Sequence, residues 1–245
     1  NELAWTDNLL ADPAECEAEA EGVVDMIIRH SASPPRTLLH LGCGAGAHDS
    51  TFKRHFGVTG VDISRGMLDI ARARHPEIEY IEGDMRTLRL EREFDAVAIP
   101  DSIDYMASPE ELRMAIQTAA VHLKPGGVLL VTGKTSETFR DNNFAYSGTQ
   151  GDTHVTLLEN NYINPYRPGT YEAAIVYLIR HGGELTIRTE CHVLGLFPLD
   201  TWERIFADAG LSLRKTDIHG AYDQYLLGDG EYPLHAFIGS RVDQP

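Results

Sequence analysis

A run of glycines followed by an acid could together bind a nucleotide. Residues 38–47 read Leu-Leu-His-Leu-Gly-Cys-Gly-Ala-Gly-Ala, so Gly42, Gly44 and Gly46 follow an apolar segment. Glycine lets the backbone come close to a ligand. Asp62 ends the next apolar segment, and a carboxylate there can accept hydrogen bonds from both hydroxyls of a ribose. The pattern therefore predicts a nucleotide pocket.

The glycine pattern alone fits two enzyme classes. Gly42, Gly44 and Ala47 satisfy the dinucleotide fingerprint, and Asp62 follows Gly42 by 20 residues, as in NAD-dependent dehydrogenases. Gly46 makes the same stretch read G-x-G-x-G. A dehydrogenase therefore stays open on this motif alone, and binding of NADH would favour it.

Further motifs follow the glycines in a fixed order. They are Asp62-Ile63-Ser64-Arg65, then Gly83-Asp84-Met85, then the apolar segment 94–99, and then Leu123-Lys124-Pro125-Gly126-Gly127. This ordered set, from about residue 38 to residue 132, resembles the class I S-adenosylmethionine (SAM)-dependent methyltransferases. The resemblance implies an α/β fold with a doubly wound, mostly parallel seven-stranded sheet of the Rossmann-like type. It also implies SAM as the cofactor and S-adenosylhomocysteine (SAH) as its product.

The resemblance assigns the cofactor contacts residue by residue. The expected cofactor-binding residues are Trp5, Gly42, Cys43, Gly44, Gly46, Asp62, Ile63, Met67, Asp84, Met85 and Pro100. The glycines would wrap the methionine half of SAM, Asp62 would accept from the ribose, and Ile63 would pack on the adenine. Asp84 would accept from the adenine amino group beside the Met85 backbone, and Met67 either closes the adenine edge or belongs to the core.

Two positions depart from the family pattern. Trp5 stands in an N-terminal segment where related enzymes often have tyrosine, so it is either a cover for the cofactor or an exposed anchor. His40 stands two residues before the first glycine, where relatives often carry an acid. We expect His40 to be a packed, hydrogen-bonded residue rather than a ligand.

Helix and strand patterns alternate up to residue 132. Asp12, Ser64 and Ser108 each precede a helical pattern and can cap it. The expected strands are 37–41, 58–62, 78–82, 94–99 and 128–132. This alternation predicts a parallel sheet with helices on both faces. Near the end of the chain, Asp200 and Glu203 form a capping-box pattern for a helix through residue 209, followed by strands 211–216 and 234–240.

The pattern changes between residues 133 and 197. Residues 133–169 are rich in Asn, Thr, Gly and Tyr and have little helix signal. Segments 171–180 and 184–197 read as two strands of a hairpin around Gly182-Gly183. We interpret 133–197 as an inserted antiparallel lid or substrate-binding region, and 1–132 with 198–245 as the SAM-binding domain. Tyr162, Tyr166 and Tyr171 are candidates for lining the substrate cavity or packing the lid.

Composition limits the partners. The chain has 245 residues and a net charge of −16, with a pI near 5.0, which disfavours a nucleic-acid partner because phosphate binding needs clustered Lys and Arg. No apolar run is long enough to span a membrane. The 3 scattered cysteines and 11 scattered histidines suggest a reducing, cytoplasmic setting without a structural metal. The composition is compatible with either a monomer or a homo-oligomer.

Chemistry is expected in the loop Pro100-Asp101-Ser102-Ile103-Asp104-Tyr105, because ligands of such sheets meet the carboxyl ends of the strands. Asp101 and Asp104 could attract an ammonium group and accept its proton, and Tyr105 could orient the substrate by hydrogen bonding. His192, in the predicted hairpin, could also reach the pocket. The alternatives are a polar helix-entry loop and a structural histidine.

The later part of the chain narrows the resemblance to small-molecule N-methyltransferases of natural-product pathways, notably the nucleotide-linked aminosugar N,N-dimethyltransferases. The matching stretches are Gly83-Asp84-Met85-Arg86, Glu137-Thr138-Phe139 and residues 192–197. The resemblance implies methyl transfer to the amine nitrogen of a small metabolite, such as an aminosugar or an amino-acid-derived intermediate. The alternatives are a small-molecule O-methyltransferase and a SAM-binding regulator without turnover.

Overall fold

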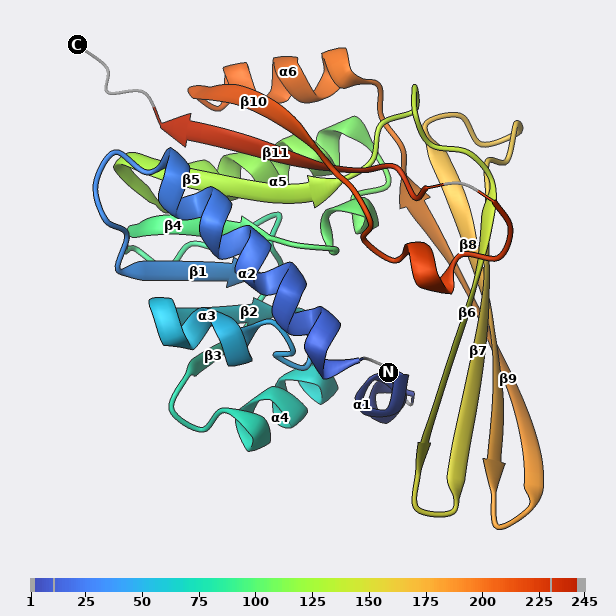
Figure 1. The fold of residues 1–245 in the computed structure, drawn as a ribbon. Helices are drawn as coiled ribbons and strands as arrows, with labels where there is room; N and C mark the ends of the chain where they lie inside the picture. The colour runs from blue at the N-terminus through green and yellow to red at the C-terminus, as the bar shows by residue number, and fades with distance from the viewer. Residues whose placement is uncertain (1–2, 11, 230, 242–245) are drawn as a thin grey trace.

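The computed structural model describes residues 3–10, 12–229 and 231–241, and these form two β-sheets with helices (Figure 1). The strands are β1 (Thr37–Leu41), β2 (Gly57–Asp62), β3 (Glu79–Glu82), β4 (Phe94–Ile99), β5 (Leu123–Gly133), β6 (Asn142–Gln150), β7 (Thr153–Tyr162), β8 (Thr170–His181), β9 (Glu184–Gly195), β10 (Leu211–Ile218) and β11 (Leu234–Arg241). The helices are α1 (Asp7–Leu10), α2 (Pro13–His30), α3 (Asp49–His55), α4 (Arg65–Arg74), α5 (Pro109–Val121) and α6 (Leu199–Asp208), with short 3-10 turns η1 (Ala4–Thr6), η2 (Ile103–Tyr105) and η3 (Asp223–Tyr225). Among the described helices, none is long and apolar enough to cross a membrane.

The larger sheet has seven strands in the order β10-β11-β5-β4-β1-β2-β3. Strands β1 to β5 pair in parallel, whereas β11 runs antiparallel to both β5 and β10. The chain builds β1, β2 and β3 outward on one side and then returns to place β4 on the other side of β1. This confirms the predicted doubly wound, mostly parallel seven-stranded sheet, and it puts the ligand-binding edge at the carboxyl ends of β1 and β4.

Helices cover both faces of this sheet, because its central strands are apolar on both sides. In β1, Leu38 packs into the core under α2 and α3, while Leu39 packs into the core under α5 and α6. Successive residues of a strand point to opposite faces. Figure 1 shows α2 crossing one face while α5 lies behind the other. A strand buried on both faces requires the continuous apolar runs seen in the sequence.

The helix starts follow the sequence with one exception. Asp12, Ser64 and Ser108 each accept a hydrogen bond from a backbone N–H in the first turn of α2, α4 and α5, as predicted. The predicted capping box of α6 is wrong, because the N-cap residue is Pro198. The Leu199 N–H instead donates to the Glu137 carboxylate, 3.0 Å away and far earlier in the chain.

The smaller sheet contains β6, β7, β8 and β9, joined as consecutive antiparallel hairpins. The β8–β9 hairpin was expected from the sequence, whereas β6 and β7 lie in the region where no strand was predicted. All four strands come between β5 and α6 in the chain. Figure 1 shows this sheet beside the carboxyl ends of the large-sheet strands, with its hairpin tips extending beyond them.

Candidate functional site

A cavity of about 990 Å³, here called the large cavity, lies at the carboxyl ends of β1, β2 and β4. This is the edge at which doubly wound sheets bind ligands. The predicted cofactor residues that line it are Gly42, Cys43, Gly44, Asp62, Ile63, Met67, Asp84, Met85 and Pro100. Gly46 and Trp5 do not line it. The structure therefore brings together most of the predicted cofactor set.

The loop between β1 and α3 requires glycine. Gly42 and Gly46 both have a φ of +73°, a conformation that L side chains rarely adopt. A Cβ on Gly42 would lie 2.2 Å from the Ser102 Oγ, and one on Gly46 would lie 2.8 Å from the Tyr80 hydroxyl. The lack of a side chain at Gly42 therefore lets Ser102 pack against the loop beside the cavity. At Gly46 it lets Tyr80 pack against the other side of the turn.

Asp62, at the end of β2, ties the glycine loop to the next strand. One of its carboxylate oxygens accepts from the Gly44 N–H and the other from the Ser64 N–H, each at 2.8 Å. A carboxylate offers about four acceptor sites, so each oxygen retains capacity for a further donor. The exposed side chain of Ile63 lines the same wall of the large cavity. The arrangement can accept a diol beside an apolar ring face.

His40 is buried beneath the loop, as expected. Its Nδ1 lies 2.7 Å from one carboxylate oxygen of Asp49, and the Tyr80 hydroxyl donates to the other at 2.8 Å. Burial acts to raise the pKa of Asp49, but His40 and Tyr80 together lower it below its ordinary value. The buried, ionised carboxylate of Asp49 therefore lies next to the glycine loop. It was not identified from the sequence.

Asp84 lines the large cavity but already has a strong partner. The Arg86 side chain donates to both of its carboxylate oxygens, at 2.6 to 3.0 Å, and also pairs with Glu111. The hydrogen bonds from Arg86 lower the pKa of Asp84. Arg86 therefore takes up much of the acceptor capacity that the predicted adenine contact needs.

The loop after β4 places Asp101 at the edge of the large cavity. Asp101 has a φ of +53° and is exposed, and its N–H donates to the Thr132 Oγ1 at 2.9 Å. The Tyr222 hydroxyl, from the loop after β10, donates to the Asp101 carboxylate at 2.6 Å. A left-handed backbone at a residue other than glycine costs energy, and such residues concentrate at functional sites.

Tyr105 and His192 meet at the boundary between the two sheets. Tyr105 lines the large cavity and is 56% exposed. The His192 ring, on β9, lies edge-on to the Tyr105 ring with 5.7 Å between centroids. His192 also lies 3.4 Å from the Glu190 carboxylate, and it does not line the large cavity. The structure thus brings these predicted residues together, and of the two only Tyr105 lines the large cavity.

Asp104 points away from the large cavity into a buried ion pair. It pairs with Lys134 at the end of β5, and the Tyr171 hydroxyl of β8 donates to the same oxygen at 3.1 Å. Burial acts to lower the pKa of Lys134, but Asp104 raises it well above its ordinary value. Lys134 was not identified from the sequence, and it holds Asp104 in a structural contact that joins the two sheets.

The other predicted side chains lie farther from the large cavity. Trp5 is 38% exposed in η1, next to α1, which packs on β6 and β7. Tyr162 and Tyr166 are also exposed, whereas Tyr171, in β8 of the smaller sheet, is buried. The structure therefore does not bring Trp5, Tyr162 or Tyr166 to the cofactor edge.

Comparison with known proteins gives the class of this site. Residues 38–127 match a family model described as a methyltransferase domain. The chain is 32% identical, over 79% of its length and 82% of the relative, to the dTDP-3-amino-3,4,6-trideoxy-alpha-D-glucopyranose N,N-dimethyltransferase of Streptomyces venezuelae. It is 33% identical, over 80% of its length and 77% of the relative, to the dTDP-3-amino-3,6-dideoxy-alpha-D-glucopyranose N,N-dimethyltransferase of Streptomyces fradiae.

The chain belongs to the class I SAM-dependent methyltransferases. Solved structures agree over nearly the whole chain. The crystal structure of Streptomyces venezuelae DesVI superposes with a TM-score of 0.79 at 27% identity, covering 92% of this chain and 91% of that one. The SAM-bound amino pentose methyltransferase CalS10 superposes with a TM-score of 0.77 at 25% identity, covering 93% and 92%. SAM is therefore the cofactor of this methyltransferase, and a dehydrogenase is excluded.

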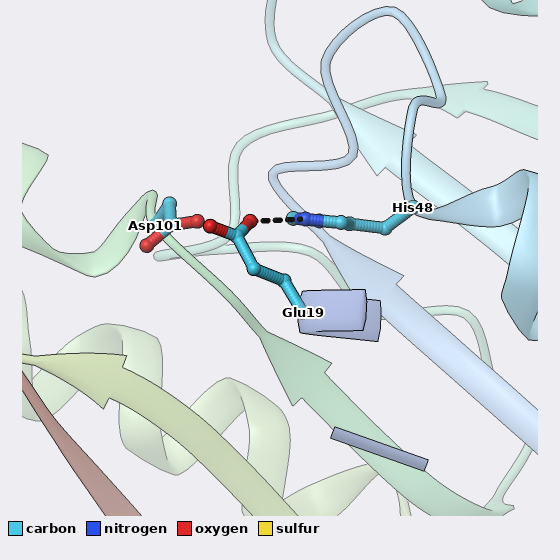
Figure 2. Close-up of side chains that lie close together, drawn as sticks. All are labelled: Glu19, His48 and Asp101. Atoms are coloured by element: carbon cyan, nitrogen blue, oxygen red, sulfur yellow. Dashed lines mark hydrogen bonds and ion pairs between the residues drawn. The ribbon is translucent and has the colours of Figure 1, made fainter. Parts of the chain in front are cut away.

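Figure 2 shows a cluster in this methyltransferase that sequence reasoning missed. Glu19 of α2, His48 of the glycine loop and Asp101 each offer a ligand atom, and these atoms lie within 4.8 Å of one another. His48 Nε2 is 3.4 Å from a Glu19 oxygen. Burial acts to lower the pKa of His48, but Glu19 and Asp101 raise it above its ordinary value. The three residues come from separate segments, so no local pattern reveals them.

The cluster lies between the large cavity and a second one of about 270 Å³, here called the small cavity. His48, Pro100 and Asp101 line both cavities. The remaining wall of the small cavity comes from α2, from Thr132 near the end of β5, from residues between 218 and 224, and from Leu234 of β11. The methyltransferase thus has a second, smaller cavity against the same strand ends that carry the large cavity.

Proposed function

We propose that this methyltransferase transfers the methyl group of SAM to the amine nitrogen of a small metabolite, an aminosugar or an amino-acid-derived intermediate of a natural-product pathway. The observation that carries the proposal is the identity of 32% and 33%, over about four-fifths of the chain, to two enzymes named as N,N-dimethyltransferases of amino sugars. The carboxylate of Asp101, at the edge of the large cavity, supports an amine acceptor because it attracts a cation.

Most of the predicted cofactor residues have a role in this proposal. The loop from Gly42 to Gly46 holds the methionine half of SAM, and Asp62 accepts from the ribose hydroxyls. Ile63 and Met67 enclose the adenine, and Asp84 with the Met85 backbone meets its edge. The positions of Asp62 and Ile63 in the large cavity support these roles.

The protein contributes alignment and a proton acceptor. When bound, SAM supplies an electrophilic methyl group on a positively charged sulfur, which leaves as a neutral thioether. An amine must first lose a proton, and Asp101 can accept it before solvent carries it away. The nitrogen lone pair then forms the new C–N bond as the C–S bond breaks. Tyr105, supported by His192, orients the acceptor, while Asp104 with Lys134 fixes the loop that carries both.

The insertion at residues 133–197 would supply the acceptor-binding wall. The position of β9 supports this proposal, because its His192 meets Tyr105 at the edge of the large cavity. The Asp104–Tyr171 hydrogen bond also links β8 to the loop after β4. The boundary would then separate the SAM-binding domain, 1–132 and 198–245, from this region.

The test is methyl transfer from isotopically labelled SAM to matched amine and hydroxyl acceptors. We expect products that gain one or two methyl groups on nitrogen, located by mass spectrometry and NMR. Asp101→Asn should lower kcat by roughly tenfold or more, as expected for loss of a general base. Methylation on oxygen would identify an O-methyltransferase instead. SAH binding without any product from the amine series would favour a regulator.

A further inference from the structure

The small cavity has an unusual charge pattern. Its described lining contains three carboxylates, Glu15, Glu19 and Asp101, and no lysine or arginine. The Tyr225 and Tyr222 hydroxyls donate to Glu15 and Asp101 respectively, but a neutral phenol leaves the negative charge in place. Two histidines of this lining can offset it: His48, which contacts Glu19, and His219, which contacts Glu231 outside the cavity. A net negative chamber of this kind favours a cationic ligand.

The spacing within the cluster suits an ammonium group. A tetrahedral ammonium that donates two hydrogen bonds of about 2.8 Å joins acceptors up to about 4.6 Å apart. The ligand atoms of Glu19, His48 and Asp101 lie within 4.8 Å of one another, so small side-chain movements suffice. Because His48 already pairs with Glu19, the two carboxylates are the acceptors and His48 positions one of them.

The position of the cluster connects it to methyl transfer. Asp101 faces the large cavity on one side and the small cavity on the other. An ammonium held at Asp101 therefore lies beside the cofactor site, while the rest of the molecule can extend into the small cavity. The remaining wall of that cavity includes apolar side chains, among them Val23, Met26 and Leu234, which can pack on a carbon skeleton.

The large cavity is not arranged to bind a nucleotide diphosphate. The described lining of the large cavity contains three arginines, Arg54, Arg74 and Arg86, and two histidines that already contact carboxylates, His40 and His48. Arg54 pairs with two glutamates of α2, and Arg86 pairs with Asp84 and Glu111. The Arg74 side chain donates to the Ala45 carbonyl. An anionic group placed here would have to compete with these existing contacts.

We propose that Glu19 and Asp101, with His48, bind the ammonium group of the methyl acceptor, and that this acceptor is a free cationic amine without a nucleotide diphosphate. The proposal rests on the proposed N-methyltransferase function and narrows its substrate class. It separates this chain from the relatives above, whose names specify dTDP-linked substrates.

The test is calorimetric binding to the full chain loaded with SAH. The probe is 3-amino-3,6-dideoxy-D-glucose, the free form of the sugar in one relative's name. Two control ligands are compared with it. They are 6-deoxy-D-glucose, which lacks the ammonium charge, and the dTDP-linked amine, which adds a nucleotide diphosphate. We expect the free amine to bind at least roughly tenfold more tightly than either control ligand. Weaker or equal binding of the free amine overturns the proposal.

Substitutions assign the binding to the cluster. Glu19→Gln and Asp101→Asn should each weaken the free amine by roughly tenfold or more and leave SAH affinity within about twofold. Asp25→Asn, which removes an exposed carboxylate from the same helix, should change neither affinity. An equal loss of SAH affinity in Glu19→Gln would assign the cluster to the cofactor and overturn the proposal. A stoichiometric divalent cation that wild type retains and Glu19→Gln loses would overturn it in favour of a metal site.

These outcomes separate the proposal from the wider function. If the dTDP-linked amine binds better and becomes methylated on nitrogen, the N-methyltransferase function stands and the free-amine inference fails. If the free amine binds but only hydroxyl acceptors react, the cluster is an ammonium site and the N-methyltransferase function fails.

Discussion

Asp62 joins two segments of the chain that both border the large cavity. Its carboxylate accepts from Gly44 and from Ser64, so it holds the glycine loop against the start of α4. Removing the carboxylate therefore affects both the loop and the proposed ribose contact. A hydrogen bond to a charged group contributes about 1.5–3 kcal/mol.

We expect Asp62→Ala to raise the dissociation constant of SAH by roughly tenfold to a hundredfold, as measured by calorimetry. Glu82→Ala is the matched control, because Glu82 ends the neighbouring parallel strand β3 and does not line the large cavity. An equal loss of affinity in both variants would contradict the ribose role of Asp62.

Asp95 shows how one side chain can fasten several elements. One of its oxygens accepts from the backbone of Arg36 and from both the N–H and the hydroxyl of Thr37, and the other accepts from Lys124. Burial acts to raise its pKa, but Lys124 and the hydrogen bonds to Arg36 and Thr37 lower it from 3.8 to about 2. The starts of β1 and β5 are thus tied to β4.

This lowered pKa predicts a pH-dependent contribution to stability. Because the folded-state pKa lies below the unfolded one, the contribution is present above about pH 4 and is lost as pH falls towards 2. Asp95→Asn should cost about 1–2 kcal/mol near neutral pH, measured by urea unfolding. The difference from wild type should shrink as pH falls below 4. A difference that stays constant from about pH 7 to pH 3 would show that charge is not its source.

The contact between Lys134, Asp104 and Tyr171 joins the two sheets near the carboxyl ends of the large-sheet strands. Lys134 and Asp104 are about nine-tenths buried as side chains, with exposures of 10% and 11%. Lys134 also lies over the rings of Tyr171 and Tyr232. Breaking a buried pair leaves one charge without compensation, which costs more than the pair itself contributes.

We expect Lys134→Met to lower the free energy of unfolding by about 3–5 kcal/mol. The double variant Lys134→Met/Asp104→Leu should recover more than half of that loss, because it removes both charges. Tyr171→Phe, which deletes one hydrogen bond, should cost only about 1 kcal/mol. Urea unfolding of the three variants and of wild type measures the four free energies of unfolding and checks this order of stability. A double variant no more stable than Lys134→Met would contradict a charge-based explanation.

The sequence predicts the elements best where burial imposes a period. The strands of the large sheet and the caps at Ser64 and Ser108 follow from apolar runs and local capping chemistry. Strands β6 and β7 were not predicted because they are polar, and in β6 only Phe144 is fully buried. The cap of α6 was not predicted because the residue that accepts from its first N–H, Glu137, lies 62 residues earlier in the chain.

The residues of the proposed cofactor site could be predicted because they are close in sequence, whereas those of the proposed acceptor site could not because they come from distant segments. Gly42 and Asp62 follow directly from one βαβ unit, whose spacing is local. Glu19, His48 and Asp101 come together only after three separate segments have folded. Lys134 also gave no signal, because a lysine at the end of a strand is ordinarily solvated, and only the fold reveals its burial.

Across the whole molecule, the two sheets differ in how they are supported. The large sheet has helices on both faces, whereas the tips of the small sheet around Gly151 and Gly182 project beyond it and are exposed (Figure 1). Local opening should therefore cost little at these tips and most at β1, β4 and β5, which form the core. A bound ligand adds stability only to states that retain its site.

Hydrogen exchange with and without SAH tests this distribution. We expect SAH to slow exchange in residues 40–48, 62–67 and 100–106, which surround the large cavity. Exchange at the hairpin tips, 149–153 and 181–184, should stay fast and unchanged, because no cofactor contact reaches them. At about 100 times its dissociation constant, SAH stabilises the folded state by about 2.7 kcal/mol, so global exchange should slow by about a hundredfold. Protection confined to the hairpin tips would place the cofactor against the small sheet and contradict the site described above.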